Sequence, residues 1–462
     1  MGWSKESDFY FSAYFYSERP PAGLGWNPGL PTPTFTKIGN QFLCDKKVED
    51  FINPASFPNK LYVDIDATGA GDGSSWVNAY NSIYDALLAV EASGVATRIL
   101  VMSGIYDYGF STTQSGNITY MNVDYTLEAM HGRVTTLAGA TGDHKSWALE
   151  GSYTDVWVST ITQSIRGYDF LSKMYLKPVN SIAEVAETPN SIYVNGSLVY
   201  VRRLDGTKPD RTLFVIRNFP GVGLGGKAKC LIRNFDGYGG KSGTFRFYED
   251  TDGNGVPTIT ESWGVLDNCT AQYAMSGEFD DVFGVTVFSI EDWTLGVFFN
   301  CTVGQSWADG FAGSVYGDYP PHILAVGCKS VGSGTNFDSI TPRQSCNGIT
   351  MHGGAKLAEI GGYFSGSVGS NVGHVDEDTR AWHFGTKAGD SDGDKPNNGG
   401  LEWGAFGVWG SSVTMWLSFC TDFGSPIGVM KSSLANCYIR NHSGTGTISD
   451  GVVVLPEVPY RL

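Results

Sequence analysis

The sequence lacks any long apolar segment. No run approaches the roughly 18 apolar residues that a helix needs to cross a bilayer. The first twenty residues, MGWSKESDFYFSAYFYSERP, also lack the basic start, apolar centre and cleavage site of a secretory signal. These absences predict a soluble protein that is made in a cytoplasm and does not insert into membranes.

Basic residues are scarce. The chain has 31 Lys and Arg against 47 Asp and Glu, which gives a formal net charge of −16. This balance repels phosphate backbones and offers no basic stripe to nucleic acid. We therefore expect no nucleic-acid partner.

Cysteine motifs for metal binding are missing as well. The eight cysteines form no C-x-x-C pair and no zinc spacing, which argues against a metal cluster. Glycine, with 61 residues, and aromatic residues, at 13%, are abundant instead. This composition is typical of many short strands joined by tight turns and argues against an all-helical fold.

A repeat surrounds five of the cysteines. Each has an apolar residue three positions before it, in LDNCTA, FFNCTV, AVGCKS, LSFCTD and LANCYI. Cys269, Cys301 and Cys328 follow one another at the period of a solenoid, whose units bury their apolar faces only by stacking. We interpret these cysteines as small inward-facing hydrophobes of successive coils. A ladder of disulfides is the alternative, which a reducing cytoplasm would oppose.

The stretches between the turns predict the fold class. FGVTVFSI, HILAVGCKSVG and VTMWLSF read as short buried strands bounded by turn residues. Before the first strands, Ala79, Ile83, Ala86, Leu87 and Val90 follow helical spacing up to Gly94. The expected fold is all-β, a right-handed parallel β-helix (solenoid) with an N-terminal capping helix.

The first 60 residues do not fit this pattern. Residues 8–35 combine aromatic side chains with prolines, which excludes a regular helix beyond the start. An extended arm that lies along a neighbouring chain is one interpretation, and a flexible tail is the other. The aromatic content favours an arm for attachment or oligomerisation.

Three segments resemble known β-helix proteins. Residues 62–87, YVDIDATGAGDGSSWVNAYNSIYDAL, resemble the entry to pectate-lyase-like β-helices, and residues 181–206 continue this similarity. Residues 347–385, NGITMHGGAKLAEIGGYFSGSVGSNVGHVDEDTRAWHFG, resemble a segment of tailed-bacteriophage spikes. The resemblance implies a virion spike, a homotrimer held to a virion attachment protein through the N-terminal arm, that is synthesised in the host cytoplasm.

The sequence then divides into four parts: an attachment or oligomerisation arm (1–60), a capping helix with the first rungs (61–148), an insertion or irregular β region (149–262), and the main rungs with the C-terminal end (263–462).

Two departures from the resemblance disfavour catalysis. Ser314 stands near the place of a familiar histidine, and Gly353 follows His352 where an acidic residue is more usual.

Acidic residues one coil apart are candidates for hydrolysis. Cleavage of a glycosidic bond needs two carboxylates about 5–9.5 Å apart, and neighbouring rungs can supply them. Asp280 and Asp281 precede Asp309 by about one coil. Solvated turns would explain the same residues.

A histidine-rich segment is the candidate for lyase chemistry, which needs a base and a group that neutralises a uronate carboxylate. His352, His374 and His383 lie within 32 residues, together with Asp376 and Arg380, in a chain with seven histidines. Hydrogen bonding to turns or to neighbouring rungs is the plainer explanation.

Aromatic side chains of the C-terminal third predict a glycan groove. Flat rings stack on pyranose faces, although packing in the core accounts for some of them. The predicted substrate-binding residues are Tyr363, Trp382, His383, Trp403, Trp409 and Trp416.

A calcium-loop pattern occurs in YEDTDGNGVPTITES, residues 248–262. Strand-like flanks and Pro257 exclude the helix–loop–helix of a calcium sensor. A structural Ca²⁺ site with Asp250, Asp252, Asn254 and Glu261 as ligands is one interpretation, and a hairpin turn without an ion is the other.

Three functions are therefore open. The first is a spike that recognises bacterial surface polysaccharide. The second is a depolymerase, a lyase or a glycoside hydrolase, that cleaves it. The third is a structural virion decoration without sugar specificity.

Overall fold

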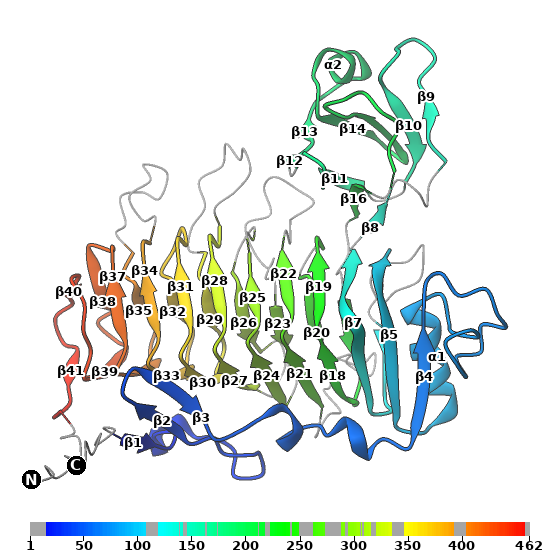
Figure 1. The fold of residues 1–462 in the computed structure, drawn as a ribbon. Helices are drawn as coiled ribbons and strands as arrows, with labels where there is room; N and C mark the ends of the chain where they lie inside the picture. The colour runs from blue at the N-terminus through cyan, green and yellow to red at the C-terminus, as the bar shows by residue number, and fades with distance from the viewer. Residues whose placement is uncertain are drawn as a thin grey trace, which may run out of the picture.

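A computed structural model of the 462-residue chain describes residues 15–457 except 108–118, 138, 142–145, 162–163, 173, 211, 218–221, 241–242, 249–261, 273–287, 292–293, 305, 307–308, 316–319, 335–345 and 392–402. Short strands dominate it, and neighbouring rungs pair almost entirely in parallel (Figure 1).

The first face of the structure is formed by the longer strand of each rung. Its strands are β4 (Asn59–Val63), β5 (Thr97–Tyr106), the start of β7 (Tyr125–Leu137), β18 (Lys229–Arg233), β21 (Trp263–Asp267), β24 (Leu295–Phe299), β27 (His322–Val326), β30 (Lys356–Ile360), β33 (Arg380–Phe384), β36 (Thr414–Ser418), β39 (Asn436–Arg440) and β41 (Val453–Val454).

The second face follows each of these strands after a tight bend. It consists of the end of β7, β19 (Phe235–Tyr238), β22 (Thr270–Gln272), β25 (Thr302–Val303), β28 (Lys329–Val331), β31 (Tyr363–Ser365), β34 (Lys387–Gly389) and β37 (Thr421–Phe423).

The third face is a ten-stranded sheet that closes each turn of the solenoid. Its strands are β6 (Thr119–Tyr120), β17 (Val222–Gly225), β20 (Phe245–Tyr248), β23 (Phe288–Glu291), β26 (Phe311–Ser314), β29 (Ile349–Met351), β32 (Val372–His374), β35 (Phe406–Val408), β38 (Ile427–Lys431) and β40 (Thr447–Ile448). The regular rung-to-rung register confirms the predicted parallel β-helix.

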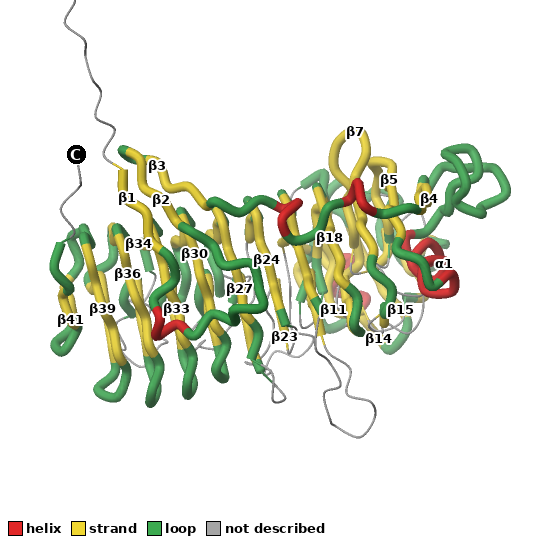
Figure 2. Tube along the Cα trace, turned by 90° about the horizontal axis from the view of Figure 1, so that it is seen from below, coloured by secondary structure: helices red, strands yellow, loops and turns green. Residues whose placement is uncertain are grey.

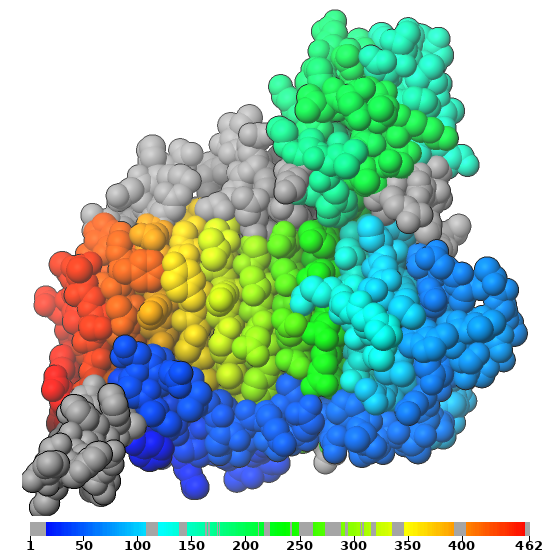
Figure 3. Space-filling model, viewed as in Figure 1, coloured from blue at the N-terminus to red at the C-terminus, as the bar shows by residue number. Residues whose placement is uncertain are grey.

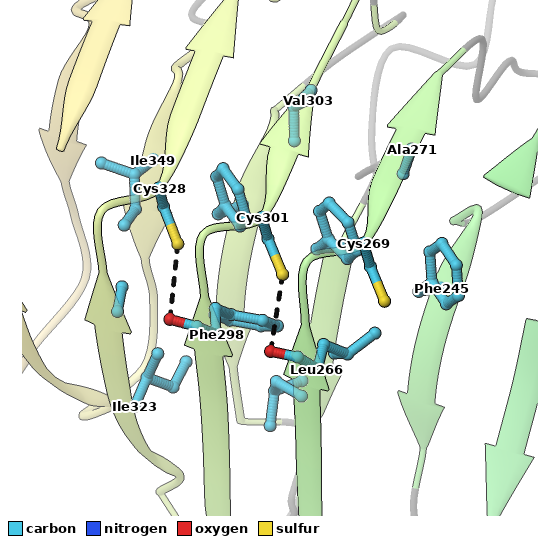
Figure 4. Packing of buried hydrophobic residues seen from close by; sticks show 14 of the residues in the cluster. Phe245, Leu266, Cys269, Ala271, Phe298, Cys301, Val303, Ile323, Cys328 and Ile349 are labelled. Atoms are coloured by element: carbon cyan, nitrogen blue, oxygen red, sulfur yellow. Dashed lines mark hydrogen bonds between the residues drawn. The ribbon is translucent and has the colours of Figure 1, made fainter. Parts of the chain in front are cut away.

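The interior is filled by alternate residues of the three faces, because successive side chains of a strand point to opposite sides. Phe298, Ile323 and Leu357 belong to one continuous buried cluster. Figure 4 shows Cys269, Cys301 and Cys328 stacked in this interior, where the thiols of Cys301 and Cys328 donate to carbonyls of the preceding rung at 3.5 Å. All eight cysteines are free thiols.

The bend between the first and second faces needs a left-handed backbone. The residue after each first-face strand has φ between 49° and 72° along eight consecutive rungs: Asn234, Asn268, Asn300, Gly327, Gly361, Gly385, Phe419 and Asn441. Asparagine and glycine tolerate this conformation best, which explains the asparagines that precede Cys269 and Cys301. Cys437 differs, since it lies within β39.

Helix α1 (Ile83–Ser93) lies at the N-terminal end of the solenoid (Figure 1). The Ser82 hydroxyl accepts a hydrogen bond from the Asp85 N–H at its start, and Gly94 ends it with φ 65°. Its apolar stripe, Ile83, Ala86, Leu87 and Val90, joins the same buried cluster as the first rungs.

Residues 15–57 run along the outer surface of the first face of their own chain, as Figure 2 shows. We call this segment the arm. It begins with the antiparallel strands β1 (Phe15–Glu18), β2 (Phe35–Ile38) and β3 (Gln41–Cys44) and includes short 3₁₀ turns at Ala22–Leu24, Val48–Asp50 and Pro54–Ser56. Leu24, Phe35 and Ile52 of the arm pack on apolar side chains of the same chain, and the predicted contact with a neighbouring chain stays a prediction.

Residues 149–262, expected to be an irregular insertion, divide between two parts of the structure. Strands β17, β18, β19 and β20 already stack as rungs. Residues 139–217 instead form a unit that projects from the solenoid (Figure 1). Its elements are β8 (Gly139–Thr141), β9 (Ala148–Leu149), β10 (Trp157–Thr160), β11 (Ser164–Asp169), β12 (Met174–Tyr175), β13 (Lys177–Pro178), α2 (Ile182–Glu187), β14 (Ser191–Asn195), β15 (Leu198–Arg202) and β16 (Leu213–Arg217).

Within the described residues, neither α1 nor α2 is long and apolar enough to cross a membrane.

Candidate functional site

A histidine between two carboxylates forms the centre of the candidate site. His352 follows β29, and its Nδ1 lies 2.9 Å from Asp376 Oδ2. Its Nε2 lies 3.3 Å from Thr350 Oγ1 and 4.0 Å from Asp309 Oδ2. Asp309 comes from the turn before β26 and also accepts a hydrogen bond from the Asn347 N–H. Three consecutive rungs therefore supply these groups.

The environment fixes the charges of this cluster. Burial lowers the pKa of His352, but the hydrogen bonds and charges of Asp309 and Asp376 outweigh that effect and raise it to about 9. The hydrogen bond with His352 lowers the pKa of the Asp376 carboxyl from its ordinary value. At neutral pH the imidazole therefore carries its proton, and Asp376, whose side chain is 56% exposed, is an accessible carboxylate.

A pocket of about 430 Å³ opens beside Asp376. Its lining consists of Val375, Asp376, Glu377, Trp409, Gly410 and Ser411. The Ser411 hydroxyl donates to Glu377 Oε1 at 3.0 Å, which orients that carboxylate. The pocket therefore combines an indole, a hydroxyl and two carboxylates, the groups that bind sugar rings and their hydroxyls.

Trp409 lines this pocket, and Trp403 packs against it. Their ring centroids are 5.1 Å apart and the planes are nearly perpendicular. A Cβ atom at Gly407 would lie 2.1 Å from the Trp409 ring, so only glycine at this position lets the indole lie across the third face. Trp409 thus brings an aromatic ring next to the two carboxylates of the pocket.

The geometry permits hydrolysis more readily than elimination. One imidazole separates the two carboxylates, and the contacts on its two sides keep Asp309 and Asp376 within the limit of about 9.5 Å for an inverting pair. A lyase base must be neutral, whereas His352 holds its proton up to a pH of about 9.

Two predicted residues lie in the interior instead. His374 Nε2 is 2.8 Å from His383 Nε2, and His383 Nδ1 is 2.8 Å from Glu359 Oε2. The Gly362 N–H and the Thr386 hydroxyl also donate to Glu359. All three residues of this Glu359–His383–His374 chain are fully buried, so they are out of reach of a polysaccharide.

Three more predicted residues lie beneath the arm. Trp382 is fully buried and stacks on Phe35 of the arm, with centroids 4.5 Å apart. Arg380 donates to the Gly23 carbonyl, and Trp416 packs against Gly23. These side chains hold the arm against the first face and are therefore not open to a ligand.

The remaining predicted residues lie elsewhere. Tyr363 is 36% exposed on the second face and stacks with Phe423. Asp280 and Asp281, and the calcium-loop residues Asp250, Asp252, Asn254 and Glu261, lie outside the described residues. The calcium site and the role of that acidic pair therefore stay predictions. Among the residues that are described, no group of three His, Cys, Asp or Glu side chains is arranged to hold a metal ion.

Glu359, Thr350, Glu377 and Ser411 were not predicted from the sequence. A signal for Glu359 was present, because it occupies an inward position of KLAEI, two residues after Leu357, where a lone carboxylate needs buried partners. Glu377 and Ser411 belong to turns of neighbouring rungs, and only the stacking brings them together.

The fold resembles solved β-helix structures at low sequence identity. A pectate lyase, Pel9A, is 13% identical with a TM-score of 0.42, over 87% of this chain and 79% of its own. A glycoside hydrolase is 9% identical with a TM-score of 0.45, over 83% and 96%. The receptor-binding domain of the siphovirus 9NA tailspike is 10% identical with a TM-score of 0.29, over 80% and 74%.

No family model and no curated protein matches the sequence. The TM-scores lie below 0.5, so the assignment rests on the strand pairing described above. The fold defines the chain as a right-handed parallel β-helix protein. The likeness to a pectate lyase and to a phage tailspike domain is a likeness of the fold alone.

Proposed function

We propose that this protein recognises a bacterial surface polysaccharide in the pocket beside Trp409. The observation that carries this proposal is the meeting of Trp409 with Asp376, Glu377 and Ser411 in one open pocket of about 430 Å³. An indole face provides stacking, and the carboxylates accept hydrogen bonds from sugar hydroxyls.

We further propose that recognition serves a virion spike, which acts as a homotrimer attached to the particle by its N-terminal arm. The support is the resemblance of residues 347–385 to phage spikes, and this segment includes both His352 and Asp376. The spike is made in the host cytoplasm and reaches the cell surface of the next host as part of the particle.

The first experiment is a binding titration with capsular and O-antigen polysaccharides from candidate hosts. Trp409→Ala should weaken binding about tenfold or more, because a stacking indole is a typical anchor of a binding site. Trp76→Ala is the matched control, since Trp76 is also partly buried but lies next to Tyr62 at the N-terminal end. Binding to none of the glycans would overturn the proposal and leave a structural decoration.

Cleavage of the bound glycan is a second candidate function, favoured by the placement of His352 between Asp309 and Asp376. In an inverting hydrolase, Asp376 would take a proton from water as the general base, and Asp309, on the other side of the imidazole, would donate a proton to the leaving oxygen.

The products decide between these functions. Reducing ends that appear without absorbance in the unsaturated-uronate band would indicate a hydrolase, and Asp376→Asn should then abolish them. A rise of both signals would indicate a lyase and contradict the assignment of His352. Retained binding with neither signal would leave recognition alone.

A further inference from the structure

The second face carries a row of outward side chains that the pocket does not use. Lys329 pairs in register with Tyr363, and Tyr363 with Lys387. Because neighbouring strands lie about 4.8 Å apart, the two lysines are about 10 Å apart along the solenoid axis with the tyrosine between them. Both lysines are exposed.

The centre of this row is aromatic. Phe423 stacks with Tyr363, with ring centroids 5.6 Å apart and planes 22° apart. Gly389 makes the contact possible, since a Cβ atom there would lie 2.6 Å from the Phe423 ring. Val331 adds an exposed apolar side chain next to the row. The rungs thus hold a flat apolar patch between two cations.

The charges of the row are not balanced within the face. Thr302 and Thr421 continue the row on its two sides, and Asp236, the described acid farther along the row, is paired with Arg133. Among the described side chains, no ion pair includes Lys329 or Lys387, and Asp390 stands at the rim beside Phe423. In a chain of net charge −16, two cations placed together without acidic partners are suited to an anionic ligand.

The arm lies along one border of this part of the second face. Phe42 of the arm packs at Gly361 and Gly385, the bends that lead into β31 and β34. Figure 3 shows the yellow and orange rungs exposed above the blue arm. Among the described residues, no segment covers this part of the face, so a long ligand can lie along the axis with the arm as one wall.

We propose that the second face is a binding surface for an acidic polysaccharide. Its chain would lie along the solenoid axis, with carboxylates on Lys329 and Lys387 and a sugar ring against Tyr363. This surface is distinct from the pocket of Trp409, which is lined by the carboxylates of Asp376 and Glu377 and suits neutral or cationic sugars. The inference therefore goes beyond the proposed function and does not depend on it.

The test is a titration of the full chain with two acidic glycans, hyaluronate and alginate, and with neutral dextran. We expect an acidic glycan to bind with an affinity that falls with added salt. The double variant Lys329→Gln/Lys387→Gln should weaken binding at least tenfold, and Tyr363→Ala should also weaken it. The control Lys60→Gln/Lys208→Gln removes two exposed lysines from elsewhere on the chain and should bind as the wild type does.

Each outcome has a defined meaning. Binding of neither acidic glycan, or equal losses in the two double variants, would overturn the proposal. Loss in Trp409→Ala alone would overturn it as well and would place the acidic glycan in the pocket. If Lys329→Gln/Lys387→Gln loses affinity for the acidic glycan while Trp409→Ala binds it as the wild type does, the second face is supported as the binding surface. This result would hold whatever the pocket itself binds.

Discussion

At the scale of single residues, His352 links the charge of the candidate site to stability. Burial lowers the pKa of His352, yet its two carboxylate neighbours raise it from 6.5 to about 9. A base with a raised pKa in the folded state contributes stability that is complete below about pH 6.5 and is lost as the pH rises through about 9. His352→Gln should therefore lower the melting temperature at about pH 6, and the difference should vanish near pH 10. Melting curves across this range check it, and a difference that is independent of pH would contradict it.

The bend residues permit a second prediction at this scale. Asn300 has φ 50°, a conformation that costs other L-residues about 1–2 kcal/mol. Asn300→Ala should lower the free energy of unfolding by about 1 kcal/mol, whereas Asn300→Gly should change it by less than about half that amount. Urea unfolding measures both. Equal losses in the two variants would show that the asparagine side chain matters more than the backbone.

At the scale of strands, the alternation of side chains explains which predictions succeeded. The repeat around Cys269 and Cys301 gave the solenoid correctly because four of the eight bends are followed by a buried cysteine: Cys269, Cys301, Cys328 and Cys420. Trp382 and His383 were predicted as one binding surface, although neighbours in a strand point to opposite sides. Strand alternation could have separated them, but their burial could not be foreseen, since it depends on the arm outside Trp382 and on Glu359 inside His383.

The buried Glu359–His383–His374 chain makes its strands sensitive to acid. Burial and the neighbouring His383 hold the pKa of His374 well below 6.5. The unfolded chain therefore binds a proton that the folded chain rejects, and stability falls as the pH drops below about 6.5. Replacing His374 should remove up to about 1.4 kcal/mol per pH unit of this slope.

His374→Met is the suitable variant, and Met351→Leu is its control in the paired strand. Unfolding free energies measured between about pH 6 and pH 4 check the prediction. The slope should flatten in His374→Met and stay as in the wild type in Met351→Leu. The same slope in both variants would mean that His322 and His442, whose pKa values burial also lowers, account for the acid sensitivity.

At the scale of the whole molecule, the arm completes the first face. The outward side chains there, among them Leu231, Val265 and Leu324, are apolar and would be exposed without it. Charged contacts hold both ends, with Glu18 bound to Arg440 and Glu49 to Arg233. The sequence indicated an extended aromatic segment. It could not show which surface this segment covers, because the apolar stripe of the first face could be covered by the arm of any copy of the chain.

The packing of the arm on its own chain bears on whether the proposed homotrimer needs the arm. Since residues 15–57 pack on their own β-helix, we expect the proposed trimer to form through other surfaces. Phe35→Ala removes the ring that stacks on Trp382 and should cost about 3 kcal/mol of stability without changing the mass measured by light scattering. Phe15→Ala, which truncates an exposed ring of the same arm, should change neither quantity. A wild-type monomer would refute the trimer, whereas a trimer that dissociates in Phe35→Ala would mean that the arm contributes to the contact between chains.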